Sequence, residues 1–147
     1  PTSSALDILH QFGIRPSHQR LTVLTYLMEH RDHSSAEEIF ENLHKEMPMI
    51  SRTTVYNTLR LFSDAGVVQT LSIGVHPLVF ETNLTPHAHF FCRCCKSITD
   101  IPVQEADWQR MKDYGGPSQA EMHVTFNGIC ENADDIHEPT TALKRQN

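Results

Sequence analysis

The stretch SRTTVYNTLRLFSDAG, residues 51–66, predicts a helix with two different faces. Ser51 is a typical N-cap residue and Gly66 is a typical helix stop. One face is apolar, with three side chains at helical spacing: Val55, Leu59 and Phe62. Another face carries three residues that are four apart: Arg52, Tyr56 and Arg60. Such a face suits the major groove of DNA, but a merely solvent-exposed helix shows the same pattern.

The segments on either side of this helix predict a winged helix-turn-helix domain. Three helices are expected upstream, with these limits: an end at Phe12, a start at Ser17, and a start at the capping-box pair Ser34 and Glu37. Downstream, alternating polarity predicts the two strands of a hairpin: residues 67–73 and 78–81. We therefore assign residues 1–82 to an N-terminal winged-helix domain, and we expect the hinge near residues 82–86.

Beyond the hinge the pattern changes to short strands around one helix. The expected elements are a hairpin, a helix and a half-buried strand: residues 87–92, 97–101, 105–114, and the alternating Met122, Val124 and Phe126. Residues 83–135 form the second domain, and residues 136–147 are expected to be a flexible tail. The predicted fold class is α+β, with a winged helix-turn-helix domain followed by an α/β domain.

The charge of the chain argues against a protein that binds DNA through an overall basic field. The net charge is −6, and residues 1–82 hold six Arg and Lys against nine Asp and Glu. DNA binding would depend on a few locally placed arginines, with bound divalent cations offsetting part of the acidity. Because no apolar run approaches ~20 residues and no export signal is visible, we expect a cytoplasmic protein that does not contact a membrane.

Histidines and cysteines cluster just after the hinge. His87 and His89 are two apart on an expected strand, so their imidazoles share one face. Cys92 and Cys95 have the spacing of one half of a zinc knuckle, and Cys130 is the remaining thiol outside this cluster. Simpler interpretations stay open, namely two surface histidines and small residues at a strand end.

Two stretches of the sequence resemble the ferric uptake regulator (Fur) family. They are GIRPSHQR, residues 13–20, and SRTTVYNTL, residues 51–59. The resemblance implies a homodimeric transcriptional repressor on a palindromic DNA operator, with residues 83–135 as the dimerisation domain. It also implies a set of DNA-contacting residues: Arg15 in the minor groove, Arg20 on phosphates and, from the recognition helix, Arg52, Thr54, Tyr56 and Arg60.

The same resemblance implies a regulatory metal site on five residues with suitable side chains: His33, Glu81, His87, His89 and Asp100. Three imidazoles and two carboxylates suit Fe(II) or Mn(II), and Zn(II) can occupy the site in purified protein because its affinity ranks above that of Fe(II). His33 and Glu81 belong to the first domain. One ion would therefore tie both domains together and set the distance between the two recognition helices of a dimer.

The resemblance leaves the sensed signal open. An aspartate at the position of Asp100 resembles the peroxide-sensing branch of the family, in which His33 and His87 would be the residues oxidised. A glutamate at the position of Glu81 resembles the iron-sensing branch. We expect a repressor that senses iron or manganese, peroxide, or both. The alternatives are a zinc-responsive regulator, a member without metal control and a metal-dependent hydrolase. An enzyme is not expected, because five protein ligands leave little room for substrate.

The structural zinc site of the family is incomplete in this sequence. Cys92, Cys95 and Cys130 are present, but Ala133 stands where a further cysteine would complete a second Cys-x-x-Cys. A zinc ion held by three thiolates needs a fourth ligand, for which the candidates are Asp134, His137, Cys94 or water. Otherwise, zinc binding is weak or absent.

Overall fold

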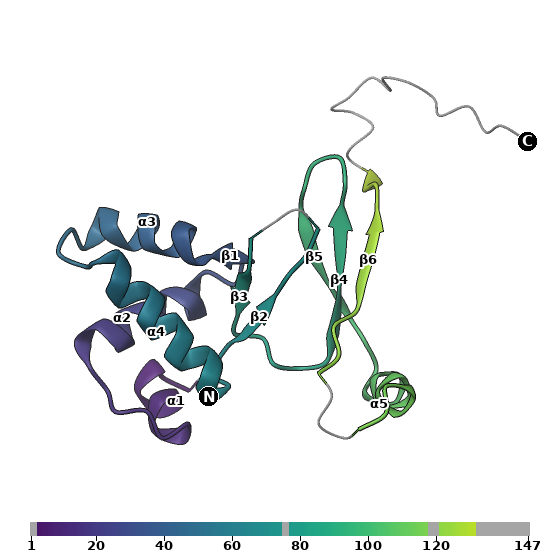
Figure 1. The fold of residues 1–147 in the computed structure, drawn as a ribbon, viewed down its shortest axis with the longest axis horizontal. Helices are drawn as coiled ribbons and strands as arrows, with labels where there is room; N and C mark the ends of the chain where they lie inside the picture. Colours follow the sequence, from purple (N-terminus) through teal and green to yellow (C-terminus); the bar gives the residue numbers. More distant parts are fainter. Residues whose placement is uncertain (1–2, 75–76, 118–120, 132–147) are drawn as a thin grey trace, which may run out of the picture. The chain divides into compact units, whose positions relative to one another are not determined.

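The computed structural model of the chain describes residues 3–74, 77–117 and 121–131. The chain divides into two compact units, Pro1–Thr85 and Pro86–Asn147. The division falls between Thr85 and Pro86, within the segment where the sequence predicts the hinge. Figure 1 shows the elements of each unit. No helix in the described ranges combines the length and the apolar character that crossing a membrane requires.

The described residues of the N-terminal unit form four helices: α1 (Ala5–Gln11), α2 (His18–Glu29), α3 (Ala36–Glu46) and α4 (Arg52–Ala65). Each begins after a serine whose side chain accepts a backbone N–H of the first turn: Ser4, Ser17, Ser35 and Ser51. Helix α4 ends at Gly66, which adopts φ 81° in the left-handed region that favours glycine. The helix predicted over residues 51–66 is therefore confirmed.

The start of α3 differs from the prediction by one residue. The capping box is formed by Ser35 and Glu38, not by Ser34 and Glu37. Ser34 belongs to the short strand β1 (Ser34–Ser35) and pairs with Phe80, so the helix cannot begin before the backbone leaves that strand. Glu37 therefore has no part in the capping box of α3.

Three strands complete the N-terminal unit as an antiparallel sheet of order β1-β3-β2. Strands β2 (Gln69–Leu71) and β3 (Val79–Glu81) form the predicted hairpin, although they are shorter than predicted. Apolar side chains from all four helices and from β3 form the core, among them Leu9, Leu24, Ile39, Leu59, Phe62 and Phe80. Each such burial stabilises the fold by about 1.5–3 kcal/mol. The unit is a winged helix-turn-helix.

The C-terminal unit is built on a three-stranded sheet of order β5-β4-β6, followed in Figure 1 from teal to yellow-green. Its elements are β4 (His87–Cys92), β5 (Ile98–Pro102), α5 (Glu105–Tyr114) and β6 (Thr125–Gly128). Strand β4 is central, antiparallel to β5 and parallel to β6. The chain therefore has the predicted α+β fold class.

The last strand differs from the prediction. We expected Met122, Val124 and Phe126 to alternate inward along one strand, but β6 begins only at Thr125 and Phe126 is 55% exposed. The parallel register with β4, in which His89 pairs with Thr125, sets this start. Within the ranges that the structure describes, β6 pairs with β4 alone and is an edge strand.

Candidate metal sites and nucleic-acid interface

Two histidines and one aspartate converge in the C-terminal unit. His87 and His89 point to the same side of β4 because successive side chains of a strand alternate. Asp100 on β5 is the register partner of His89. The two Nε2 atoms are 3.1 Å apart, and Oδ1 of Asp100 lies 3.4 Å from that of His89 and 3.9 Å from that of His87.

This spacing is that of ligand atoms around one metal ion. Metal–nitrogen bonds of about 2.0–2.1 Å put two ligand atoms about 3.0–3.4 Å apart, depending on the coordination angle. Both histidine side chains are only 4% exposed, so their rings are held in a restricted setting. Two imidazoles with a carboxylate form a donor set that suits Fe(II), Mn(II) or Zn(II).

A second pair of ligand-type side chains lies in the N-terminal unit. His33, in the loop between α2 and β1, has its Nε2 atom 3.3 Å from Oε2 of Glu81 at the end of β3. Their side chains are 9% and 6% exposed. Of the five residues expected at the regulatory site, the structure thus brings two together in one unit and three together in the other.

Gln69 orients Glu81 and was not predicted as a site residue. Its Nε2 atom donates a short hydrogen bond to Oε1 of Glu81 and a second of 3.1 Å to the carbonyl oxygen of Asn83. Oε2 of the same carboxylate is thereby left facing His33. Gln69 and Glu81 are register partners across the β2–β3 hairpin, so a correct hairpin register would have been the signal for this contact.

Three thiols form a compact cluster in the C-terminal unit. The sulfur atoms of Cys92, Cys95 and Cys130 all lie within 4.8 Å of one another, and those of Cys95 and Cys130 are 3.6 Å apart. Tetrahedral zinc with Zn–S bonds of about 2.3 Å requires sulfurs about 3.8 Å apart, so the cluster fits zinc. Cys94 is not part of this group. Asp134 and His137, the other candidate fourth ligands, lie outside the described residues.

The cluster also favours one thiolate. The backbone N–H groups of Cys130 and Cys95 donate to Sγ of Cys92, at 3.3 and 3.5 Å. These hydrogen bonds lower the pKa of Cys92 to about 6. The neighbouring Cys92 sulfur raises the pKa of Cys130 to about 11, because the thiol form of Cys130 can donate to it. Zinc binds thiolates. In the metal-free protein, the lowered pKa favours the thiolate form at Cys92, whereas Cys130 stays a thiol.

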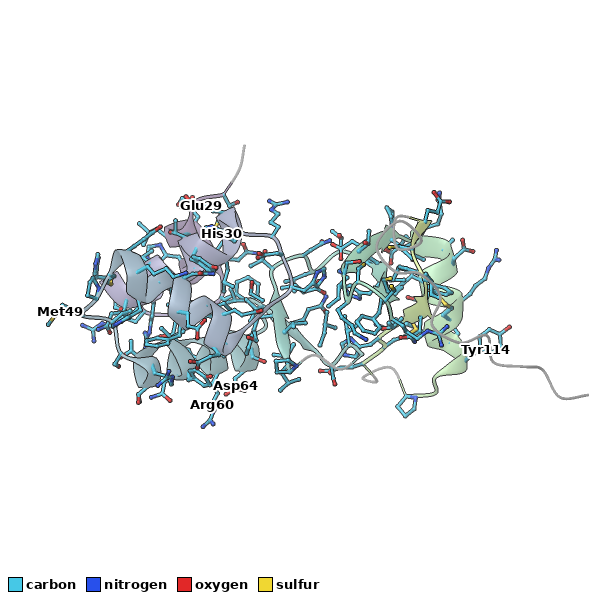
Figure 2. The ribbon with its side chains drawn as sticks, turned by 90° about the horizontal axis from the view of Figure 1, so that it is seen from above. Glu29, His30, Met49, Arg60, Asp64 and Tyr114 are labelled. Carbon is cyan, nitrogen blue, oxygen red and sulfur yellow. The ribbon has the colours of Figure 1, made fainter. Side chains whose placement is uncertain are left out.

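An acidic residue, Glu37, contacts two of the three side chains on the predicted DNA-binding face of α4. Arg52 makes a bidentate contact with Glu37, with Nε at 3.0 Å and a terminal nitrogen at 2.7 Å from the two carboxylate oxygens. The hydroxyl of Tyr56 donates to the same carboxylate at 2.9 Å. Arg60 and Asp64 instead extend outward from α4, as Figure 2 shows. Two of the three residues predicted on this face, Arg52 and Tyr56, are therefore bound to Glu37.

The other predicted DNA contacts have structural roles in this unit. Thr54 is half-buried, and its hydroxyl accepts a hydrogen bond from Ser51 at 2.8 Å within the N-cap of α4. A terminal nitrogen of Arg20 donates to the carbonyl oxygen of Arg15 at 2.6 Å, which fixes the approach to α2. The side chain of Arg15 is exposed.

Comparison with known proteins adds sequence and structural relatives. Residues 11–123 match the model of the ferric uptake regulator family. The chain is 33% identical over 129 residues to a peroxide-responsive repressor, PerR, of Staphylococcus aureus, covering 86% of this chain and 87% of the relative. The ferric uptake regulator of Vibrio cholerae superposes with a TM-score of 0.65 at 27% identity, over 83% of this chain and 96% of that one. The Helicobacter pylori regulator has a TM-score of 0.71 at 18% identity, over 90% and 95%, and supports the fold alone.

Proposed function

This chain belongs to the ferric uptake regulator family, and on that premise we propose that it is a metal-dependent DNA-binding transcriptional repressor of the cytoplasm. The observation that carries the proposal is the convergence of His87, His89 and Asp100 at ligand spacing directly after the unit boundary. A winged helix-turn-helix precedes them in the chain, so a DNA reader and a metal-binding group are covalently joined.

The regulatory mechanism follows from how the five ligand-type residues are divided between the units. We propose that His33 and Glu81 bind the same divalent cation as the three residues of the C-terminal unit. Shared ligation would hold the two units in one orientation and so set the distance between the recognition helices of a dimer. Only separations near one turn of DNA, about 34 Å or a multiple, let both helices enter successive grooves of a palindromic operator.

The proposed dimer is supported by the surface of the C-terminal unit. Strand β6 is an edge strand, and three apolar or aromatic side chains near it and α5 are exposed: Tyr114 at 91%, Phe126 at 55% and Ile129 at 60%. Figure 2 shows Tyr114 directed away from the unit. Exposed apolar groups of this kind often mark protein interfaces. A two-fold dimer would present two recognition helices to one duplex.

The proposed DNA contacts come from the α4 face and from the segment before α2. Arg60 and Tyr56 are assigned to base edges in the major groove, Arg15 to the minor groove and Arg20 to phosphates. Arg52 and Thr54 lie in the first turn of α4, the proposed recognition helix, which would approach the phosphate backbone. Because the chain is acidic overall, Arg15, Arg20 and Arg60 would carry the attraction to DNA, whereas Glu37 balances the charge of Arg52.

Metal dependence of DNA binding is the decisive test of the proposed function. A duplex is first enriched from a random library with Mn(II)-loaded protein, and its affinity is then measured for metal-stripped protein with Mn(II), Fe(II) or Zn(II) added back. We expect metal to tighten binding by about 5- to 150-fold, the range typical of coupled sites. Restoration by Zn(II) alone would identify a zinc-responsive regulator. Unchanged binding after chelation would reject metal control and reopen the hydrolase alternative.

The finer signal, which we propose to be iron together with peroxide, has its own test. Fe(II)-loaded protein treated with hydrogen peroxide is expected to release the enriched duplex, because bound iron directs oxidation to its own ligands. Peptide mass spectrometry should then find an added oxygen atom on His33 or His87. Mn(II)-loaded protein is the control and should stay bound. If the iron form also stays bound and unmodified, the chain senses metal availability without peroxide.

Removing Gln69 is expected to weaken metal binding without removing a ligand. In Gln69→Ala the Glu81 carboxylate loses the donor that orients it, and loss of such outer contacts costs about 10- to 100-fold in metal affinity. Mn(II) affinity can be measured by isothermal titration calorimetry. The matched control is Gln109→Ala on α5, whose amide contacts Asp113 and no ligand-type histidine. Equal Mn(II) affinities for the two variants would exclude an orienting role.

We also propose a structural zinc ion held by Cys92, Cys95 and Cys130. Support comes from their sulfur spacing and from the thiolate that the two backbone N–H groups favour at Cys92. When bound, zinc would link the end of β4 to the chain after β6. Cys94 is described and lies outside the sulfur group, so the fourth ligand is assigned to one of the other candidates expected from the sequence, Asp134, His137 or water.

A further inference from the structure

The carboxylate of Glu37 accepts hydrogen bonds from two side chains of the recognition helix, Arg52 and Tyr56. We propose that Glu37 is a specificity-determining residue of the DNA interface, which withholds Arg52 from phosphate binding and fixes Tyr56 in place. The inference rests on the proposed DNA-binding function. Its consequence is that base contacts, and not unspecific charge attraction, decide how tightly the chain holds a given duplex.

The contact between Glu37 and Arg52 has the geometry of a strong pair. The guanidinium binds both carboxylate oxygens, at 3.0 and 2.7 Å, in the forked arrangement that Arg and carboxylates favour. The same guanidinium lies 4.7 Å from the centre of the Phe40 ring, so a cation–π contact holds it from a second side. Exposed ion pairs are ordinarily weak, but these two restraints add to the simple attraction.

Tyr56 is held by the same carboxylate. Its hydroxyl donates to Oε2 of Glu37 at 2.9 Å, while 42% of the residue stays exposed. The hydrogen bonds from Arg52 and then Tyr56 lower the pKa of Glu37, so the carboxylate is charged at neutral pH. The hydrogen bond fixes the hydroxyl end of a ring that stays partly exposed, and such a ring suits an apolar contact such as a thymine methyl.

The electrostatic effect on DNA binding follows from where the pair lies. Arg52 is the first residue of α4, where the partial positive charge of the helix end would join its guanidinium in attracting phosphates. Glu37 cancels the guanidinium charge at this place. Of the three residues Arg52, Tyr56 and Arg60, the cation that has no partner among the described residues is Arg60. Figure 2 shows its side chain directed outward. Attraction to an arbitrary duplex is therefore kept low.

The test compares salt dependence for two DNA probes, the duplex enriched with wild-type protein and a duplex of scrambled sequence. Glu37→Gln removes the charge and keeps the side-chain size. We expect it to bind the scrambled duplex several-fold more tightly and to steepen the plot of log affinity against log salt by about 0.9, the slope of one additional phosphate neutralised by Arg52. The ratio of enriched to scrambled affinity should fall, because Arg52 would bind a phosphate of either duplex.

Three further variants make the result specific to the pair. Glu38→Gln is the matched control, since it removes the same charge one residue away, and Gln can still form the capping box that Glu38 makes with Ser35. It should leave slope and ratio unchanged. Arg52→Ala alone should weaken the binding of both duplexes, because it leaves the Glu37 carboxylate unpaired on the same face. The double variant Glu37→Gln with Arg52→Ala should return to the wild-type slope, and circular dichroism confirms that each variant is folded.

Two outcomes would overturn the inference. If the double variant Glu37→Gln with Arg52→Ala has a slope about 0.9 below that of the wild type, Arg52 already binds a phosphate in the wild type and Glu37 does not withhold it. If Glu37→Gln behaves like Glu38→Gln, the carboxylate has no role in discrimination. A wild-type protein that enriches no duplex would overturn the proposed function and this inference together, whereas enrichment with unaltered slopes overturns the inference alone.

Discussion

Replacing His89 with Ala is expected to abolish the tightening of DNA binding that Mn(II) produces, a loss of about 5- to 150-fold at saturating metal. His89 has the largest expected effect among the histidines because its Nε2 atom lies close to two other ligand-type atoms, those of His87 at 3.1 Å and Asp100 at 3.4 Å. Its removal leaves the C-terminal unit with two ligand-type side chains, His87 and Asp100, whose atoms lie 3.9 Å apart. Fluorescence anisotropy of the enriched duplex, titrated with Mn(II), measures the effect.

The design needs a control that removes a histidine without touching the cluster. His123→Ala serves, because His123 is exposed and its contact is with Glu121. This variant should keep the full response to Mn(II). Metal-free His89→Ala protein should bind DNA as metal-free wild type does, since the change lies outside the winged-helix unit. A normal Mn(II) response in His89→Ala would remove His89 from the regulatory site.

Replacing Cys92 with Ser is expected to release zinc from the purified protein and to destabilise the chain. Sγ of Cys92 is the atom of the thiol cluster that accepts two backbone N–H groups, and Cys92 is fully buried. A metal that binds only the folded state contributes about 4 kcal/mol when its concentration is 1,000 times its dissociation constant. For a unit of this size, that loss lowers the unfolding temperature by more than about 15 °C.

Zinc content by mass spectrometry and unfolding by calorimetry test this expectation together. Cys94→Ser is the matched control, because Cys94 lies two residues away and is outside the thiol cluster. It should keep both the zinc and the unfolding temperature of the wild type. Cys92→Ser protein with the same zinc content as Cys94→Ser would show that the three thiols do not form the zinc site.

Local features of the sequence were sufficient for the helices and for part of the metal-binding group. Helix α4 was predicted correctly because its cap, its apolar spacing and its glycine stop all lie within the helix and one residue on either side. The shared direction of His87 and His89 follows from strand geometry in the same way. In such cases the free-energy terms involve residues a few positions apart, so a short window of sequence contains them.

Contacts between distant segments decided the rest. The start of α3 moved by one residue because Ser34 pairs with Phe80, and β6 begins at Thr125 because of its register with β4. The hydrogen bonds between Glu37 and Arg52 join residues 15 positions apart, and the one between Gln69 and Glu81 joins residues 12 positions apart. Pairings of this kind depend on how whole elements pack, and no local propensity encodes them. The sequence alone thus predicted the winged helix-turn-helix domain and a set of ligand-type side chains, whereas tertiary packing decided which of those side chains meet and which arginine is paired with a carboxylate.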